Sequence, residues 1–175
     1  MYQYNSPAYI LANGIYLFQY LTKRGFNVEL IQLFSLATEK IIRSLQEDHL
    51  AAIISTTFLT SAKHIDEIGN FIKIHSPKTM VIAGGVKIWK SFLTMKQLKN
   101  DEVQDEIDEQ IKADTYFIDK NAKSPVDIFI NNDRGEHTLA NLLKKLQAKK
   151  SFNNMKNLAF FKNGKYIFNN RYYIE

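Results

Sequence analysis

Two short, almost uninterrupted apolar runs constrain the fold more than any other feature of this sequence. They are LAAIIS at 50–55 and TMVIA at 79–83, and a helix-like segment follows each of them. A strand that is apolar along its whole length is typical of a parallel sheet covered by helices on both faces. The sequence therefore predicts an α/β fold in which 50–55 and 79–83 are strands buried on both faces.

Strand-like and helix-like segments alternate along the rest of the chain. The periodicity of apolar residues predicts helices over 9–24, 38–46, 61–76 and 136–150 and further strands over 27–33 and over either 113–119 or 126–131. The opening residues 1–5 (MYQYN) take the place of a short or truncated first strand. Asn163-Gly164 lies between two strand-like runs in 157–170 and predicts a β-hairpin. We expect a flavodoxin-like or Rossmann-like three-layer sandwich with a mostly parallel sheet and a small C-terminal hairpin.

The length of 175 residues suits one α/β domain with a small appendage. We predict the α/β domain over residues 1–150, with a charged insertion at 96–112. Residues 151–175 are predicted to form the hairpin and a linker.

Composition excludes several classes of function. The chain has no cysteine, which rules out disulfides, a thiol nucleophile and a cysteine-ligated iron–sulfur cluster within it. The net charge is +5, but the lysines are spread along the sequence and an acidic stretch at 101–109 interrupts them, so we do not expect nucleic-acid binding. No apolar run reaches the ~18 residues that span a bilayer, and the first ten residues lack the pattern of a signal peptide. A cytoplasmic location without membrane partners is the expectation.

Glycines and hydroxyl side chains follow three of the predicted strands. In doubly wound sheets the carboxyl ends of the strands form the ligand-binding edge. The residues that the prediction places there are Ser55, Thr56, Thr57, Leu59, Thr60, Gly84, Gly85, Val86, Gly135 and Glu136. Each stretch also has a purely structural interpretation, as a helix cap, a tight turn or a partner of a helix dipole. Their predicted meeting at one edge favours a binding site.

Self-sufficient catalytic motifs are missing. There is no phosphate-binding P-loop, no G-x-G-x-x-G and no G-x-S-x-G. The four histidines have no spacing typical of metal ligands, and we predict neither a protein-ligated metal nor a catalytic residue.

Four blocks of the sequence follow one another in a recognisable order. The first is NGIYLFQYLTKRGFNVELIQL, and the second runs from the 50–55 strand to the paired glycines after 79–83. The third is VDIFINNDRGEHTLANLLKKL, and the fourth is the hairpin NLAFFKNGKYIFNN. Together they cover nearly the whole chain and resemble the cobalamin-binding domain of cobalamin-dependent radical S-adenosylmethionine enzymes.

The resemblance implies a flavodoxin-like domain that holds cobalamin with its nucleotide tail beside the sheet. Ser55 to Thr60 and the turn Gly84-Gly85-Val86 would line the tail, with no side chain on the two glycines to block it. A side chain at Gly84 or Gly85 is therefore expected to block the ligand before it harms the fold. Gly135 and Glu136 would close the edge. The residues Asn13, Gly14 and Ile15 would lie near the corrin face.

The sequence departs from the family pattern at several motifs, and these departures affect the function expected of the chain. The D-x-H-x-x-G motif of other cobalamin proteins is missing, and NNDRGE replaces the more usual Gly-Glu-Gly-Glu. Because the cluster-binding cysteines are also missing, a radical S-adenosylmethionine domain would have to follow this segment or act in trans. On its own, the chain is expected to bind the cofactor without catalysing a reaction.

Two alternatives remain open at this point. One is a degenerate flavodoxin-like interaction or regulatory module that has lost the cofactor. The other is an enzyme that uses a nucleotide or flavin at the same edge.

Overall fold

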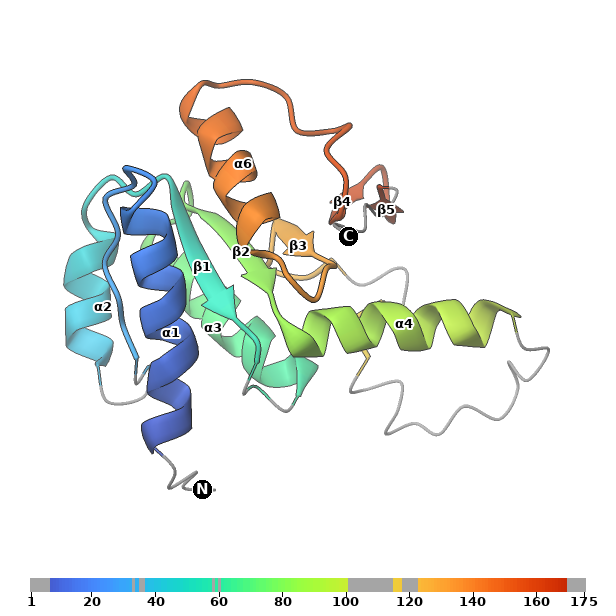
Figure 1. The fold of residues 1–175 in the computed structure, drawn as a ribbon, viewed down its shortest axis with the longest axis horizontal. Helices are drawn as coiled ribbons and strands as arrows, with labels where there is room; N and C mark the ends of the chain where they lie inside the picture. The colour runs from blue at the N-terminus through green and yellow to red at the C-terminus, as the bar shows by residue number, and fades with distance from the viewer. Residues whose placement is uncertain are drawn as a thin grey trace. The chain divides into compact units, whose positions relative to one another are not determined.

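The computed structural model of the chain describes residues 7–32, 34, 37–57, 59, 61–100, 115–117 and 123–169 (Figure 1). The chain divides into two compact units, residues 1–48 and residues 49–175, and each is described by itself. No helix in the described ranges is both long and apolar enough to cross a membrane.

The first unit contains two helices, α1 (Pro7–Thr22) and α2 (Thr38–Leu45), as the sequence predicts. Gly25 follows α1 with a φ of +83°, a conformation that suits glycine and ends the helix in a turn.

The predicted strand at 27–33 is wrong for its described residues, because 27–32 form no strand. These residues instead form an irregular segment, and the apolar residues of the alternating pattern lie on its packed side. The Cδ1 atom of Leu30 lies 3.2 Å from where a Cβ of Gly14 would be. On the polar side, Glu29 accepts a hydrogen bond from Ser44 (2.6 Å) and pairs with Lys40 (3.2 Å), which ties the segment to α2.

The second unit is built on a five-stranded mixed sheet in the order β1-β2-β3-β4-β5. The strands are β1 (Ala51–Ser55), β2 (Met80–Gly84), β3 (Ile128–Ile130), β4 (Leu158–Lys162) and β5 (Lys165–Phe168). The first three are parallel, and β4 and β5 are antiparallel. The predicted α/β class with a mostly parallel first part of the sheet is confirmed, and the arrangement is consistent with a flavodoxin-like fold.

The predicted hairpin is also confirmed, and it extends the main sheet through the pairing of β4 with β3. Asn163 and Gly164 have φ values of +53° and +77°, which is the geometry of a two-residue turn matched to the strand twist.

Burial differs between the two apolar runs. Val81, Ile82 and Ala83 of β2 are fully buried, as predicted. In β1, by contrast, 51–53 are only half-buried and Ser55 is exposed, so the prediction of burial on both faces is wrong there. The reason is position, since β1 ends the strand order and has a strand neighbour on one side only among the described residues.

Three helices cover the sheet, α3 (Ala62–His75), α4 (Val86–Asn100) and α6 (Glu136–Gln147). Phe129 and Ile130 are consecutive in β3 and so face opposite sides of the sheet. Phe129 joins an aromatic cluster that reaches α4 through Phe168 and Phe92, while Ile130 packs against Gly135 at the start of α6. Figure 1 accordingly shows α6 on one face of the sheet and α3 with α4 on the other.

Several predicted boundaries shift. Helix α6 ends at Gln147 rather than at 150, and residues 96–100 belong to α4 rather than to an insertion. The strand comes from 126–131 rather than 113–119, whose residues 115–117 include a turn. Residues 1–5 and 101–112 lie outside the described residues.

Asp127 anchors the amino end of β3. One of its carboxylate oxygens, Oδ2, accepts hydrogen bonds from the Lys73 ammonium (2.6 Å) and from the Val81 backbone N–H (2.7 Å). Its own N–H donates to the Val81 carbonyl at 2.9 Å. The Lys73 ammonium also donates to the Thr79 carbonyl (2.9 Å), so α3, β2 and β3 are joined at one point.

A second polar network ties the segment before β3 to α3. The Asp66 carboxylate accepts hydrogen bonds from Tyr116 (2.6 Å) and from Ser124 (2.7 Å). Burial and then the Asp66 carboxylate raise the pKa of Tyr116 well above its ordinary value, so the phenol stays protonated.

Candidate functional site at the carboxyl edge of the sheet

The ends of the three parallel strands meet at one edge. Ser55 is the register partner of Gly84, and Gly84 is the register partner of Ile130. The Thr56 N–H donates to the Gly84 carbonyl at 2.8 Å, which continues the ladder beyond β1. The stretches after β1, β2 and β3, predicted separately from the sequence, are therefore neighbours in the structure.

Gly85 lies against the backbone that follows β1. It has a φ of +121°, which residues other than glycine rarely adopt. A Cβ there would lie 3.1 Å from the Thr56 hydroxyl oxygen and 3.2 Å from the backbone nitrogens of Thr56 and Thr57. The missing side chain at Gly85 thus makes room for the chain's own backbone.

Gly84 and Gly135 both pack on Ile130. A Cβ on Gly84 would lie 3.2 Å from Cβ of Ile130, and one on Gly135 would lie 2.9 Å from its Cγ2. Ile130 is 2% exposed, so it has little room to move away.

These contacts correct one expectation. Side chains at Gly84 or Gly85 were expected to block a ligand while leaving the fold intact. The first atoms such side chains would meet belong to Ile130, Thr56 and Thr57, so a side chain at either position would crowd the fold before it met a ligand.

The hydroxyl groups after β1 differ in what they offer to a ligand. Thr56 is fully buried and its hydroxyl donates to the Gly84 carbonyl at 3.1 Å, so that hydrogen is already used. Ser55 is exposed, and Thr57 and Leu59 are half-buried. Thr60 lies outside the described residues. Val86, the first residue of α4, is 38% exposed.

Helix α6 begins at this edge without a side-chain cap. Gly135 is its N-cap residue, and Glu136 in the first turn is half-buried. Exposed His137 pairs with Asn141 one turn later (2.9 Å). On the other face, Ser61 caps α3 by accepting from the His64 N–H, as expected of a hydroxyl before a helix.

Asn131 is a feature of this edge that the sequence analysis did not single out. It directly follows β3 and is fully buried. Its backbone N–H donates to the Asn157 carbonyl (3.0 Å), but neither polar atom of its side chain has a hydrogen-bond partner. The sequence signal that could have revealed it is the pair Asn131-Asn132, which places amides where the apolar run IFI would otherwise continue into the core.

The predicted corrin-face residues Asn13, Gly14 and Ile15 lie in α1 of the first unit. Asn13 and Ile15 are exposed, and Gly14 packs against Leu30. Whether they join the sheet edge in one site stays a prediction.

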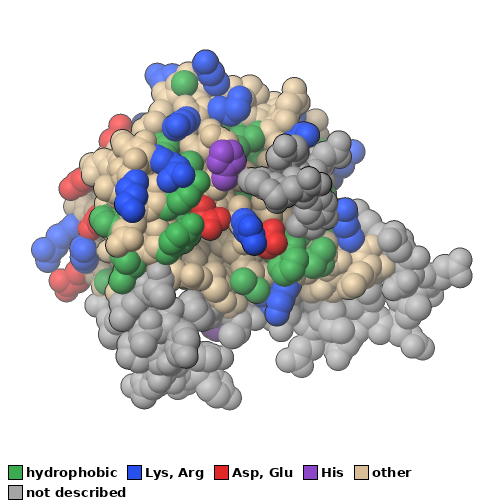
Figure 2. Space-filling model, in the orientation of Figure 1, with side chains coloured by type: hydrophobic (Ala, Val, Ile, Leu, Met, Phe, Trp, Pro, Cys, Tyr) green, Lys and Arg blue, Asp and Glu red, His purple; other side chains and the backbone are tan. Residues whose placement is uncertain are grey.

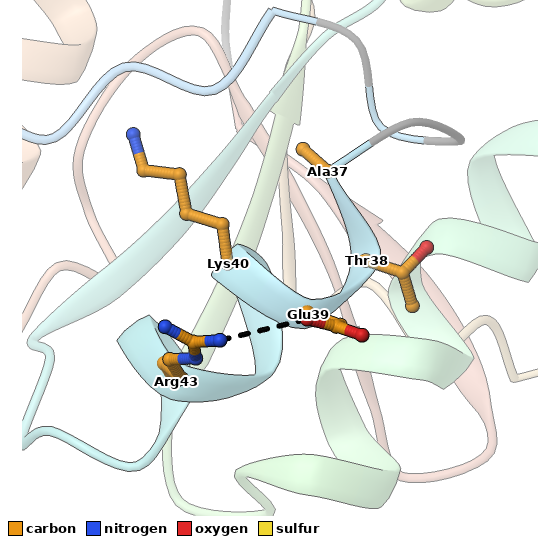
Figure 3. Close-up of a pocket in the computed structure, with 5 residues that line it drawn as sticks. All are labelled: Ala37, Thr38, Glu39, Lys40 and Arg43. Carbon is orange, nitrogen blue, oxygen red and sulfur yellow. Dashed lines mark hydrogen bonds and ion pairs between the residues drawn. The ribbon is translucent and has the colours of Figure 1, made fainter.

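A hollow elsewhere in the described chain has the character of an ordinary helix surface. Figure 3 shows a hollow at the start of α2, lined by Ala37, Thr38, Glu39, Lys40 and Arg43. The ion pair between Arg43 and Glu39 there is 3.5 Å long and largely exposed, as on an ordinary helix surface. Figure 2 shows basic side chains interspersed with acidic and hydrophobic ones on the face it displays. No cluster of three or more metal-ligating side chains occurs among the described residues.

Two solved structures share this fold. One is OxsB, a cobalamin-dependent S-adenosylmethionine radical enzyme solved with aqua-cobalamin and S-adenosylmethionine bound; the TM-score is 0.57 at 19% identity. The other is the radical S-adenosylmethionine methyltransferase TsrM from Kitasatospora setae, solved with a tryptophan substrate and a S-adenosylmethionine analogue; the TM-score is 0.55 at 12% identity.

The likeness spans 94% of this chain but 20% of OxsB, and 88% of this chain but 26% of TsrM. The fold thus corresponds to one part of each larger protein. No protein-family model matches the sequence. No curated protein matches it either.

Proposed function

We propose that this chain is a cobalamin-binding domain that serves a radical S-adenosylmethionine enzyme, with the corrinoid held at the carboxyl edge of the sheet. The observation that carries the proposal is the coincidence of two features. The fold matches part of a cobalamin-dependent radical enzyme. The edge where such a sheet binds ligands also holds a buried amide with no partner.

The residues at this edge fit a large, amide-rich ligand. Ser55 offers an exposed hydroxyl, Thr57 is half-buried beside it, and Asn131 offers one donor and one acceptor. When bound, cobalamin supplies a cobalt centre that can carry a methyl group. The chain's own residues would bind and orient the cofactor, and the radical chemistry would belong to another domain.

Binding of hydroxocobalamin to the purified chain tests the proposal. We expect the corrin absorbance to co-elute with the protein in gel filtration, and equilibrium dialysis to give a saturable affinity. A folded chain that retains no corrin would overturn the proposal. Flavin mononucleotide is the comparison ligand, and its retention in place of hydroxocobalamin would favour the flavin alternative.

Ser55→Tyr locates the site without disturbing the glycines. Because Ser55 is exposed, a tyrosine fits on the folded chain but occupies the ligand's place at the edge. We expect at least tenfold weaker hydroxocobalamin binding, and no change with the control Asn70→Tyr, since Asn70 is an exposed residue of α3. Equal affinity in both variants would place the cofactor elsewhere.

A specific observation favours a second candidate, an interaction module that has lost the cofactor. The contacts of Gly84, Gly85 and Gly135 are all explained by packing within the chain. The dialysis experiment separates the two, because a module of this kind binds no corrinoid.

A further inference from the structure

The Asn131 side chain is the one fully buried amide of this edge whose hydrogen bonds are unmade within the described chain. Its Oδ1 and Nδ2 atoms are both without partners, although the residue is 0% exposed. Folding removes both groups from bulk water, and no described residue gives either of them a hydrogen bond in return. Buried polar groups are nearly always paired, so an unpaired one calls for an explanation.

Neighbouring polar side chains do not share this condition. The Asn132 amide is bonded to the backbone of Arg134 at both of its atoms (3.4 Å each). The Asn157 amide donates to the Thr138 hydroxyl at 3.5 Å. The polar cluster at the end of β3 is therefore satisfied except at Asn131, and a general shortage of partners does not explain the exception.

The loop above Asn131 is held mainly to itself. The side-chain hydrogen bonds of residues 132–134 are short-range: the Arg134 N–H donates to the side chains of Asn132 and Asp133, and the Asn132 amide donates to the Arg134 carbonyl. The Asn131 N–H donates to the Asn157 carbonyl, so its backbone is fixed while its side chain keeps both polar atoms unpaired.

An asparagine amide presents a donor and an acceptor side by side in one plane. The group that satisfies both at once must itself offer an acceptor and a donor in the same spacing, as a carboxamide does. A phosphate or carboxylate supplies acceptors only and would leave Oδ1 unpaired. The periphery of a corrinoid carries several primary carboxamides.

We propose that Asn131 is a ligand-recognition residue that pairs with a carboxamide of the corrinoid. The inference rests on the proposed function, and it adds the chemical group that is recognised and the residue that recognises it. In the ligand-free chain, Asn131 then costs stability, and the ligand recovers it by supplying the missing pair.

Asn131→Leu is the decisive variant, since leucine has nearly the same size and no polar atoms. We expect its affinity for hydroxocobalamin to be at least tenfold weaker than that of the wild type. We also expect the midpoint of urea unfolding of the ligand-free chain to stay the same or rise, because an unpaired buried amide is removed. The control is Asn132→Leu, whose amide already has partners, and its hydroxocobalamin affinity should stay within about threefold.

Cobinamide, which lacks the nucleotide tail and keeps the peripheral carboxamides, identifies the recognised group. Equal weakening of hydroxocobalamin and cobinamide by Asn131→Leu supports carboxamide recognition. Weakening of hydroxocobalamin alone overturns it in favour of the tail.

Two further outcomes would overturn the inference. A lower unfolding midpoint with unchanged affinity would mean that Asn131 serves the fold, through ordered water, and would overturn the inference while the proposed function stands. A wild-type chain that binds neither corrinoid would overturn both, and the wild-type measurement alone distinguishes that case.

Discussion

The two ends of the short strand β3 are built in opposite ways. At its amino end, Asp127 makes three hydrogen bonds, to Lys73 and to both backbone groups of Val81. At its carboxyl end, Asn131 buries a polar side chain with no partner. The three apolar residues of β3 thus separate the Asp127 carboxylate, which accepts two hydrogen bonds, from the Asn131 amide, which has no hydrogen-bond partner.

The difference indicates a division of labour within the sheet. Polar interactions that hold helix and strands together gather at the amino end, where no ligand is expected in a fold of this class. The carboxyl end instead keeps bare backbone, an exposed hydroxyl and an unpaired amide. Unused polar groups of this kind are typical of binding sites, whose hydrogen bonds are completed by the ligand.

The largest effect is expected when the anchored end is broken. Asp127→Ala removes the partner of the Lys73 ammonium and leaves the Val81 N–H unpaired. We expect a loss of about 2–3 kcal/mol in the free energy of unfolding, since a buried donor loses a charge-assisted bond and both charged side chains are only partly exposed. Urea unfolding followed by circular dichroism measures it.

The matched control is an exposed ion pair on α3, the helix that also carries Lys73. Lys63 and Glu67 are 3.9 Å apart and both are largely exposed, so Glu67→Gln should cost less than about 0.5 kcal/mol. A similar loss in both variants would contradict the view that Asp127 anchors the sheet.

The next largest effect concerns the glycines of the carboxyl edge. Gly85→Ala places a Cβ within 3.1–3.2 Å of Thr56 and Thr57 at a φ of +121°. We expect a loss of about 2 kcal/mol in the free energy of unfolding, from backbone strain together with crowding. Thermal unfolding with and without hydroxocobalamin separates lost stability from lost binding.

Gly25→Ala is the comparison for strain alone. Gly25 also has a positive φ, of +83°, but its Cβ would meet no atom within 4 Å. We expect a loss of about 1 kcal/mol there, and an equal loss at Gly85 would mean that crowding at the edge is unimportant.

The sequence predicts most of this architecture because its signals are local. Periodicity and turn chemistry predict helices α1, α2, α3 and α6, strands β2 and β3, and the Asn163-Gly164 hairpin. The sequence instead predicts the end of α4, at 96–100, as part of an insertion. The strand predicted at 27–33 fails because alternation shows only that one side of a segment is packed. Leu30 packs against Gly14 while its neighbour Glu29 is exposed, and this gives the same alternation without a strand partner.

The site is predictable only in part. Its glycines and hydroxyls are visible as residue types that follow strands, and the parallel topology brings them together. The role of each residue depends on its tertiary contacts, which the sequence does not show. Examples are the contact of Gly85 with Thr56, the hydrogen bond from the Thr56 hydroxyl to the Gly84 carbonyl, and the unpaired side chain of Asn131.

The smallest effect concerns the second polar network, in which Tyr116 and Ser124 donate to Asp66, and it takes the form of a pH dependence. Burial and the Asp66 carboxylate raise the pKa of Tyr116 in the folded chain, whereas the unfolded chain releases that proton near pH 10. The folded state therefore keeps a proton that the unfolded state loses, and stability falls as the pH rises above about 10. Between pH 10 and 11 the wild type should lose about 1 kcal/mol more of its free energy of unfolding than Tyr116→Phe does.

At pH 7 the phenylalanine variant should be less stable than the wild type by about 1 kcal/mol, the contribution of the hydrogen bond to Asp66. Urea titrations at pH 7, 10 and 11 measure both quantities. Parallel losses in the two proteins between pH 10 and 11 would show that the Tyr116 hydroxyl ionises in the folded chain, which would contradict its burial against Asp66.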